Sequence, residues 1–310
     1  MGNLKDLSKK ENKFVGGHRA CAGCGAAICA RQIMLAAPSN TVVGLATGCL
    51  EVFSTLFPYT AWKVAVIHNA FENVAATMSG VEKAFISLKK KNKIKKNMKF
   101  IAIAGDGGTY DIGLQSLSGM LERGHDILYI CYDNEAYSNT GFQRSSATPF
   151  CAETTTEPWG KKNKGKLRNR KDITEIVAAH NIPYVAQTAL GFHNDLISKV
   201  EKALKIKGPK FINILSTCVL GWGVEPRYSL KVSQLAVESK FWPLYEIENG
   251  VYKINYYPTK KVSLLDFFKL QKRYQHLTKK ENKKLVEEIE KQIEMNWQKL
   301  EQKVKLTKEE

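Results

Sequence analysis

The sequence of 310 residues has no apolar run that approaches the roughly 18 residues needed by a membrane-spanning helix. Its start, residues 1–10, is polar and lacks the apolar block of a secretory signal peptide. We find no internal repeat and no low-complexity linker. We therefore expect a cytoplasmic protein without membrane contact. Its composition, with 44% hydrophobic and 25% charged residues, is typical of a globular protein with a sizeable core.

A disulfide framework is not expected either, because the cytoplasm keeps thiols reduced. The chain nevertheless has seven cysteines, and four of them stand out by their positions. Cys21 and Cys24 form a C-x-x-C pair, Cys49 follows a glycine, and Cys218 lies far along the chain. Clustered cysteines in a reducing compartment favour a metal or iron-sulfur site.

Negative charge is scarce, with 30 acidic residues against 47 Lys and Arg and a net charge of +17. Two runs, residues 89–99 and 161–171, each hold seven Lys or Arg and no acid. Such runs repel themselves and usually lie on solvated loops, which is our first interpretation. An acidic protein partner, nucleic acid or an anionic substrate are the alternatives, and charge alone does not separate them.

Short apolar runs alternate with amphipathic stretches of helix length between residues 20 and 220. Nearly continuous hydrophobicity in these runs is typical of strands that are covered on both faces. We expect strands at residues 41–46, 64–67, 100–104, 127–132, 184–186 and 211–215. We expect helices around residues 24–37, 71–90, 111–123, 172–180 and 193–206. This alternation predicts an α/β fold with a doubly wound, mostly parallel sheet.

The composition changes to mixed charge beyond Tyr257 and Pro258. Apolar residues then repeat at spacings of four and three, at Leu285, Ile289, Ile293, Trp297, Leu300 and Val304. This pattern predicts one amphipathic helix, whose apolar face must cover either this chain's own domain or another subunit. We accordingly expect one domain at residues 1–257 and a charged helical extension at residues 258–310.

A strand that runs into a glycine-rich turn marks the first candidate site. Residues 100–104 are followed directly by Gly105, Asp106, Gly107 and Gly108. Glycines let main-chain N–H groups and a helix N-terminus approach a diphosphate, and Asp106 is placed to hold a divalent cation. A plain strand-to-helix turn explains the same four residues, so the motif alone is weak.

A second polar segment follows the next strand and contains Asn134 and Ala136. In a parallel sheet both segments end at the same edge, where ligands bind. Asp106, the side-chain oxygen of Asn134 and the main-chain carbonyl of Ala136 would supply three oxygens to Mg²⁺. A diphosphate and water would complete the octahedron.

This pairing of Gly-Asp-Gly with an asparagine after a second strand resembles the thiamine diphosphate-binding motif. The stretches GDGGTYDIG at residues 105–113 and EAYSNTGFQ at residues 135–143 narrow the resemblance. Together with HRACAGCGA at residues 18–26 and TGCLE at residues 47–51, they resemble the β subunits of pyruvate:ferredoxin oxidoreductases, also called pyruvate synthases. The resemblance covers roughly residues 14–245 and implies the thiamine diphosphate-binding fold.

The resemblance implies thiamine diphosphate, Mg²⁺ and one 4Fe-4S cluster as cofactors. The implied cluster ligands are Cys21, Cys24, Cys49 and Cys218, since such a cluster requires four thiolates. The residues implied to bind the coenzyme and its Mg²⁺ are Gly48, Cys49, Gly105, Asp106, Gly107, Gly108, Asn134 and Ala136. Structural zinc also accepts four sulfurs, but it is redox-silent and leaves the thiamine motif unexplained.

Asn139 and Thr140 are implied to lie close to the thiazolium and the reacting carbon, which makes Asn139 the candidate for substrate contact. An Asx turn before Gly141 is the alternative explanation of Asn139. The wider thiamine superfamily often has two adjacent asparagines at the second site, whereas here Asn134 is followed by Glu135. This departure matches the ferredoxin-reducing branch better than the decarboxylases.

The implied reaction is the reversible oxidative decarboxylation of a 2-oxo acid, with pyruvate, coenzyme A and oxidised ferredoxin giving acetyl-CoA, CO₂ and reduced ferredoxin. A branched-chain 2-oxo acid, 2-oxoglutarate or oxalate are alternative substrates, because selectivity depends on pocket walls that the α subunit can supply. A basic, zinc-containing nucleic-acid-binding protein is a remote alternative. It predicts a colourless protein without thiamine, whereas the main interpretation involves no nucleic acid.

The family resemblance also implies partners in a hetero-oligomer with α, γ and δ subunits. The carboxylate that activates the coenzyme comes from the α subunit in this family, so the chain would be half of an active site. It lacks the dense cysteine runs of ferredoxin-type clusters, so electrons must pass to the δ subunit or to ferredoxin. The basic runs, including Lys161, Lys162 and Lys164, are expected to steer acidic ferredoxin.

Overall fold

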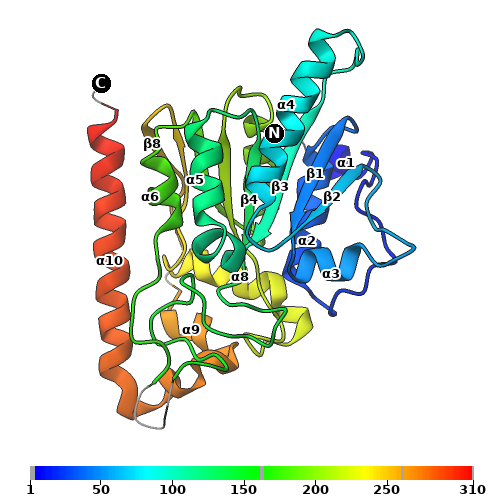
Figure 1. Cartoon of the computed structure of the whole chain (residues 1–310). Coiled ribbons are helices and arrows are strands. Elements are labelled where there is room, and N and C mark those ends of the chain that lie inside the picture. Colours follow the sequence, from blue (N-terminus) through cyan, green and yellow to red (C-terminus); the bar gives the residue numbers. More distant parts are fainter. Residues whose placement is uncertain (1–3, 159, 161–163, 260–261, 309–310) are drawn as a thin grey trace.

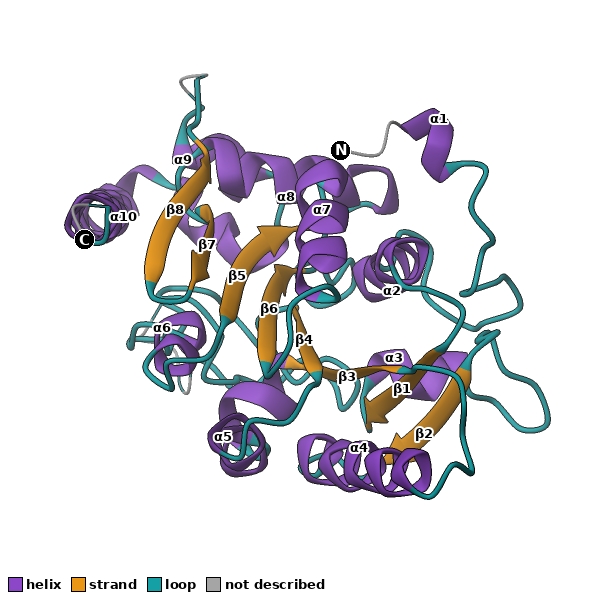
Figure 2. Ribbon diagram, turned by 90° about the horizontal axis from the view of Figure 1, so that it is seen from above, coloured by secondary structure: helices purple, strands orange, loops and turns teal. Residues whose placement is uncertain are grey.

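The computed structural model describes residues 4–158, 160, 164–259 and 262–308 and has an eight-stranded sheet at its centre (Figures 1 and 2). The strands are ordered β2-β1-β3-β4-β6-β5-β7-β8, and the first six strands of the chain run parallel. Their bounds are β1 Thr41–Ala46, β2 Ala65–Asn69, β3 Lys99–Gly105, β4 Leu128–Asp133, β5 Tyr184–Ala189, β6 Lys210–Leu215, β7 Leu244–Glu248 and β8 Val251–Tyr256. The predicted α/β fold and all six expected strands are confirmed, and the antiparallel β7 and β8 extend the sheet.

Helices cover both faces of this sheet, as a doubly wound fold requires. Viewed from above, α4, α5 and α6 lie on one face and α2, α7 and α8 on the other (Figure 2). The helix bounds are α1 Leu4–Leu7, α2 Gly25–Ala36, α3 Cys49–Ser54, α4 Val74–Lys90, α5 Leu114–Glu122, α6 Ile173–Ala178, α7 His193–Ala203, α8 Ser229–Glu238, α9 Leu264–Lys269 and α10 Lys283–Leu306. None of these described helices is long and apolar enough to cross a lipid bilayer.

The continuous hydrophobicity of the central strands follows from this two-sided cover. In β3, Ile101 and Ile103 pack into the core under α2 and α7. The alternate residues Phe100, Ala102 and Ala104 pack into the second core under α4 and α5. Because successive side chains of a strand point to opposite faces, both sets must be apolar.

The long helix α10 packs on this chain's own domain and runs along one side of the molecule (Figure 1). Trp297, Leu300 and Val304 belong to the same core as the α4–α5 face of the sheet, and Trp297 Nε1 donates to the Lys240 carbonyl at 2.8 Å. Val286 near the start of the helix joins a third core with α8 and α9. Of the two partners considered for the apolar face, the structure selects the chain's own domain.

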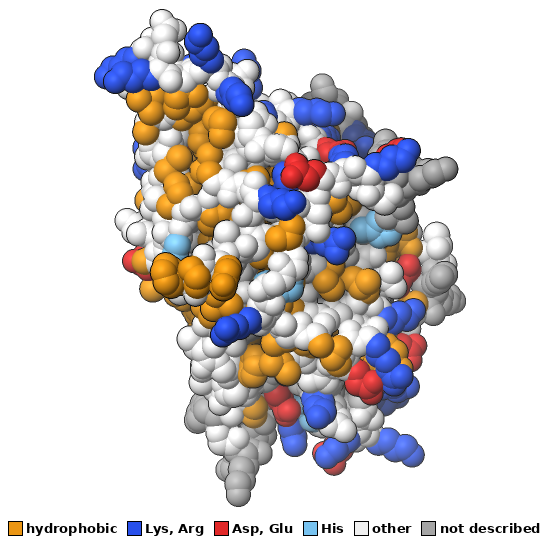
Figure 3. Space-filling view, turned by 90° about the vertical axis from the view of Figure 1, so that its right-hand side faces the viewer, with side chains coloured by type: hydrophobic (Ala, Val, Ile, Leu, Met, Phe, Trp, Pro, Cys, Tyr) orange, Lys and Arg blue, Asp and Glu red, His pale blue; other side chains and the backbone are white. Residues whose placement is uncertain are grey.

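The two basic runs differ in their surroundings. Most lysines of residues 89–99 are exposed, as expected, and gather at the end of α4 (Figure 3). The expectation of a solvated loop is wrong for Lys166 and Arg170 in the second run. Lys166 is 3% exposed and donates to the Thr148 carbonyl at 2.6 Å, and Arg170 pairs with two buried carboxylates. Both cations satisfy buried oxygens; residues 161–163 lie outside the described part of the chain.

Replacing Trp297 tests how α10 contributes to stability. Trp297→Ala removes a side chain that is 4% exposed together with its hydrogen bond. We expect the free energy of unfolding to fall by about 3–5 kcal/mol. Met295→Ala on the exposed side of the same helix should change it by less than about 0.5 kcal/mol. Guanidinium denaturation measures both variants, and equal effects would contradict the packing described here.

Candidate active site

Four neighbouring strands deliver the predicted site residues to one edge of the sheet. In the order β1-β3-β4-β6, their carboxyl ends lead to Cys49, Asp106, Asn134 and Cys218. The parallel register pairs Gly105 with Tyr132 and Asp133 with Leu215, so the segments after these strands start side by side. This is the edge at which parallel α/β sheets bind ligands.

Asp106 is 1% exposed and is bound to the loop after β4. Its Oδ1 accepts a hydrogen bond from the Asn134 main-chain N–H at 3.3 Å, and its Oδ2 accepts one from the Ser145 hydroxyl at 2.6 Å. Burial raises the pKa of the Asp106 carboxyl well above its usual range, and the nearby Asp133 raises it further. A cation beside Asp106 would favour its ionised form.

The Asn134 side chain meets Asp106 and Ala136 at one point. One atom of its amide lies 2.7 Å from Ser138 Oγ, 2.9 Å from the Ala136 carbonyl oxygen and 3.0 Å from Asp106 Oδ1. The amide nitrogen in this position donates to all three oxygens. With the amide oxygen there instead, it accepts a hydrogen bond from the Ser138 hydroxyl and faces the oxygens of Ala136 and Asp106, an arrangement that a bound cation would stabilise. The donor set therefore fits the hard, oxygen-preferring Mg²⁺ ion.

The glycine-rich turn after β3 packs tightly against aromatic side chains. A Cβ atom on Gly107 would lie 2.2 Å from a ring carbon of Tyr137, and one on Gly108 would lie 3.1 Å from the Phe71 carbonyl oxygen. The turn continues as a short π-helix, Gly107–Asp111. Close packing thus explains why position 107 is a glycine. The contact of this turn with a diphosphate stays a prediction.

Gly48 and Gly105 lie on either side of Tyr132 at the same edge. A Cβ on Gly48 would lie 3.0 Å from the Tyr132 hydroxyl, and one on Gly105 would lie 3.3 Å from its ring. The hydroxyl accepts a hydrogen bond from the Leu50 main-chain N–H at 3.4 Å. Tyr132 therefore joins the turn after β1, which carries Cys49, to the turn after β3.

The backbone of the C-x-x-C segment is docked beside Cys218. Gly23 has a φ of +72°, which suits glycine and turns the chain between the two cysteines. Gly25 donates its N–H to the Thr217 carbonyl at 3.1 Å, and a Cβ there would lie 2.5 Å from that oxygen. Only a glycine allows the main chain after Cys24 to approach the segment before Cys218 this closely.

The four cysteine thiols lie close enough to influence one another. Burial raises the pKa of Cys49 to about 12, and Cys218, Cys24 and Cys21 contribute to the rise. Among the described residues, no three His, Cys, Asp or Glu side chains form a group that could hold a single metal ion. In a 4Fe-4S cluster each thiolate binds a different iron, so its sulfurs lie farther apart than around one zinc ion. All four cysteines are free thiols, and their role as ligands of a 4Fe-4S cluster stays a prediction.

Ser138 and Trp222 connect the loop of Asn134 to the turn of Cys218. Burial raises the pKa of the Cys218 thiol, and hydrogen bonds from the Gly221 N–H and the Ser138 hydroxyl oppose this rise. The Trp222 indole N–H donates to the Asn134 carbonyl at 2.8 Å, and its main-chain N–H donates to the Cys218 carbonyl at 2.9 Å. Trp222 and Ser138 thus join the loop of the predicted magnesium ligands to the turn of a predicted cluster ligand.

Asn139 and Thr140 lie farther out on the same loop, and both are exposed. The Thr140 hydroxyl donates to the side-chain oxygen of Gln143. Gly141 donates its N–H to the Ser138 carbonyl at 3.3 Å, so the explanation of Asn139 by an Asx turn is wrong. The substrate contact of Asn139 and Thr140 stays a prediction.

Sequence reasoning missed a buried network of charges around Asn134. Asp133 and Glu135 flank it and are 0% and 1% exposed. Arg170 pairs with both carboxylates, at 2.7 Å from Glu135, and Arg273 pairs with Glu135 at 2.7 Å. Glu135 has a φ of +65°, a strained conformation for a residue other than glycine. The only signal of this network in the sequence was Glu135 itself, which stands where the wider thiamine superfamily often has a second asparagine.

Comparison with known proteins places this site in a class. The model of the thiamine pyrophosphate enzyme C-terminal TPP-binding domain matches residues 46–214, which include β3, β4 and the turns after them. In a solved structure titled as a 2-oxoglutarate:ferredoxin oxidoreductase from Magnetococcus marinus, a chain aligns with a TM-score of 0.55 and 21% identity. That alignment covers 68% of this chain and 69% of the other, and it supports the fold. The fold and the site thus define a thiamine diphosphate-dependent enzyme.

Curated relatives narrow the class further. The chain is 53% identical over 92% of its length to pyruvate synthase subunit PorB of Methanocaldococcus jannaschii and 51% identical over 96% to PorB of Thermotoga maritima; each alignment covers 95% of the relative. It is 42% identical over 94% of its length to ketoisovalerate oxidoreductase subunit VorB of Pyrococcus abyssi, 93% of which is covered. The chain therefore belongs to the pyruvate synthase PorB family of thiamine diphosphate-dependent 2-oxoacid:ferredoxin oxidoreductase β subunits.

Replacing Arg273 tests the buried charge network. Arg273→Met leaves a Glu135 oxygen without its partner in a buried site. We expect the free energy of unfolding to fall by about 3–5 kcal/mol. Arg227→Met, which breaks an exposed pair with Glu225, should cost less than about 1 kcal/mol. Urea denaturation compares the two, and a small effect of Arg273→Met would mean that Arg170 alone neutralises Glu135.

Proposed function

We propose that the chain is the β subunit of a pyruvate synthase, which converts pyruvate, coenzyme A and oxidised ferredoxin to acetyl-CoA, CO₂ and reduced ferredoxin, and the reverse. The single observation that carries this proposal is the delivery of Cys49, Asp106, Asn134 and Cys218 to one sheet edge by four adjacent strands. A thiamine enzyme that passes no electrons to a cluster would need only Asp106 and Asn134 at this edge. A zinc protein would need only the cysteines.

Asp106, Asn134 and Ala136 would hold Mg²⁺ and thereby orient the diphosphate of the coenzyme. Bound thiamine diphosphate supplies the electron sink that lets CO₂ leave a 2-oxo acid. Ser145 fixes one oxygen of Asp106 and leaves the other facing Asn134. The buried charge network holds the Asn134 main chain in place, which pre-organises the ligand set.

Cys21, Cys24, Cys49 and Cys218 would hold the 4Fe-4S cluster. Cys49 interacts electrostatically with Asp106, and Ser138 lies between the Asn134 amide and Cys218. A cluster held by these cysteines would lie next to the coenzyme and would supply a one-electron acceptor for the oxidation of the substrate. Asn139 and Thr140, exposed at the rim, would contact the substrate from this chain's side.

An α subunit would complete the site, and δ and γ subunits would belong to the same enzyme. Large apolar side chains are exposed in the segments that follow β1, β3 and β6, among them Phe57 at 98%, Ile112 at 54% and Leu220 at 62%. Exposed apolar side chains around a site favour a protein partner. The α subunit fits this place because the family resemblance assigns it the carboxylate that activates the coenzyme.

Branched-chain 2-oxo acids form the second substrate candidate. The relative named VorB, a ketoisovalerate oxidoreductase subunit, matches nearly the whole chain at 42% identity. Pyruvate is favoured because relatives named pyruvate synthase reach 53%. A panel of pyruvate, 2-oxoisovalerate, 2-oxoglutarate and oxalate on the assembled complex decides, and a higher kcat/KM for 2-oxoisovalerate would overturn the choice of pyruvate.

Anaerobic purification tests the class of enzyme directly. We expect a brown protein with a broad visible absorption, about four irons per chain and bound thiamine diphosphate. Iron and thiamine analysis together with the assay of the complex provide the measurement. A colourless protein with zinc and without thiamine would favour the nucleic-acid-binding alternative.

Replacing Cys49 tests the cluster ligand set. Cys49→Ser should leave thiamine diphosphate binding partly intact and abolish ferredoxin reduction, because a serine hydroxyl is a poor ligand for iron in a cluster. Cys29→Ala is the matched control, since Cys29 is 1% exposed in the core and should not bind iron. Iron content and the ferredoxin assay measure both. Full turnover of Cys49→Ser would remove Cys49 from the ligand set.

The basic runs are proposed to steer acidic ferredoxin. Neutralising Lys90, Lys91 and Lys93 in one variant, and Lys161, Lys162 and Lys164 in another, separates the two runs. We expect the rate of ferredoxin reduction at low salt to fall several-fold in at least one variant and its salt dependence to flatten. Unchanged rates and salt dependence in both variants would discard electrostatic steering.

A further inference from the structure

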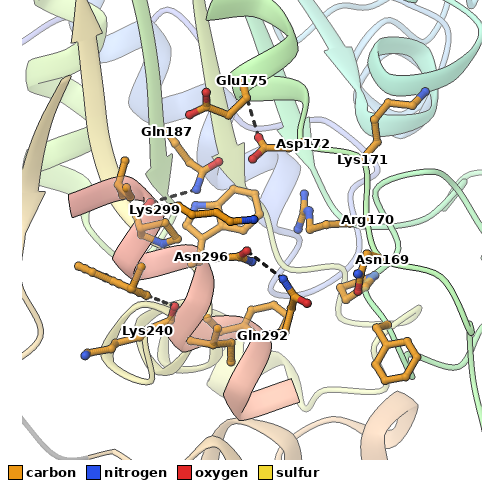
Figure 4. A pocket seen from close by; sticks show the side chains of 18 of the residues that line it. Asn169, Arg170, Lys171, Asp172, Glu175, Gln187, Lys240, Gln292, Asn296 and Lys299 are labelled. Atoms are coloured by element: carbon orange, nitrogen blue, oxygen red, sulfur yellow. Dashed lines mark hydrogen bonds between the residues drawn. The ribbon is translucent and has the colours of Figure 1, made fainter. Parts of the chain in front are cut away.

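Lys166 is a buried cation without an ion-pair partner among the residues that the structure describes. Each of the three cations that follow it, Arg168, Arg170 and Lys171, pairs with at least one carboxylate. Arg170 and Lys171 also line a cavity of about 450 Å³ beside α10 (Figure 4), whereas neither Lys166 nor residues 145–148 line it. An ammonium group that is 3% exposed and unpaired costs free energy, so the oxygens around Lys166 must offset its burial.

Three main-chain carbonyls of one turn supply these oxygens. Lys166 Nζ donates to the carbonyls of Thr148 at 2.6 Å, Ser146 at 3.4 Å and Ser145 at 3.5 Å. An ammonium group has three N–H donors, so it matches three carbonyls that converge on it. Burial, together with nearby arginines, lowers the pKa of Lys166 to about 8, and the charged form still prevails at pH 7. Because charge-assisted hydrogen bonds are about twice as strong as neutral ones, the charge holds this turn firmly.

The main chain at Lys166 is fixed against residues 151–152. The Lys166 N–H donates to the Ala152 carbonyl at 3.1 Å, and the Cys151 N–H donates to the Lys166 carbonyl at 2.7 Å. Gly165 has a φ of +73°, and a Cβ atom there would lie 2.2 Å from the Cys151 carbonyl oxygen. A glycine at position 165 therefore permits the close approach that brings Lys166 within reach of the turn.

The side chains of the same turn bind the segments that follow β3 and β4. The Ser145 hydroxyl donates to Asp106 Oδ2 at 2.6 Å, and the Thr148 hydroxyl donates to the Glu135 carbonyl at 2.6 Å. The two ends of the turn are joined, since the Ser145 N–H donates to Thr148 Oγ1 at 3.0 Å. Asp106 is a predicted magnesium ligand, and Glu135 lies between two others in the sequence. Lys166 thus reaches the predicted magnesium ligands through a single turn.

We propose that Lys166 is a positioning residue for the magnesium–diphosphate site, because its ammonium group holds the turn of residues 145–148 against Asp106 and Glu135. Without the charge, three buried carbonyls lose their donor, and the turn relaxes away from the carboxylate that it orients. The site then binds Mg²⁺ and thiamine diphosphate less tightly, although no ligand has been removed. This role rests on the proposed function, whereas the ordering of the turn by Lys166 does not.

Titration of thiamine diphosphate into the assembled complex, stripped of coenzyme and supplied with Mg²⁺, tests this role. We expect Lys166→Met, which keeps the length of the side chain and removes its charge, to weaken the affinity at least about tenfold. Lys166→Arg keeps the charge and should stay within about threefold of the wild-type affinity. Lys199→Met is the matched control, since Lys199 is also 3% exposed and donates to a main-chain carbonyl, that of Gln187 at 2.8 Å, but lies on α7. It should leave the affinity unchanged.

Hydrogen exchange of the full chain without cofactors gives a second readout. Lys166→Met should speed exchange several-fold in residues 134–137 and 145–148 and leave α7 unchanged, whereas Lys199→Met should leave both of these segments unchanged. Thermal unfolding checks that each variant is folded. If Lys166→Met does not fold, Lys166→Gln, which retains a donor without the charge, takes its place with the same expected direction.

Four results would overturn the role of Lys166: unchanged coenzyme affinity in folded Lys166→Met, an equal loss in Lys199→Met, an affinity of folded Lys166→Arg as weak as that of Lys166→Met, or unchanged exchange in both segments. A wild-type complex that fails to bind thiamine diphosphate would instead contradict the proposed function. The exchange experiment would then still decide whether Lys166 orders the turn.

Discussion

The structure of the catalytic edge depends on neutralising two carboxylates, Asp133 and Glu135, that lie in the protein interior. An unpaired carboxylate at such a depth would be protonated or would destabilise the fold. Arg170 and Arg273 form ion pairs with them. In the sequence, Arg170 precedes β5 and Arg273 follows β6, and each lies more than thirty residues from these carboxylates. The ion pairs do more than offset the burial of charge, because they define where the intervening Asn134 can lie.

The parallel sheet explains why ligand sets distant in sequence meet. The order β1-β3-β4-β6 places four strand ends side by side, and each end carries a different chemistry. Neighbouring turns are then joined by single side chains: Tyr132 between the first two, and Trp222 between the last two. These contacts tie neighbouring turns to one another, as a site that holds several cofactor ligands requires.

The architecture was predictable because it follows from a local pattern. Strands such as β3 are apolar at five successive positions, residues 100–104, and burial on both faces explains that. The Asp106–Asn134 pair was predicted because both residues follow buried strands that end at one sheet edge, whereas the set of four cysteines came from the family resemblance. Arg170 could not be found in this way, because an arginine in a basic run looks solvated until its buried partners are known, and the sequence around Arg273 does not point to Glu135. The sequence also left undecided whether α10 covers this sheet or another subunit, because an amphipathic pattern does not identify the surface against which the helix packs.

The C-terminal segment is more than a cover for the sheet. Arg273 stacks its guanidinium 3.7 Å from the centre of the Trp222 ring while it pairs with Glu135. Trp222 in turn donates to the carbonyl of Asn134 and to that of Cys218. One arginine beyond the sheet therefore supports both the loop of the predicted magnesium ligands and the turn of a predicted cluster ligand. Because these contacts join three segments that share no strand, loosening the C-terminal segment would disturb both sets of ligands together.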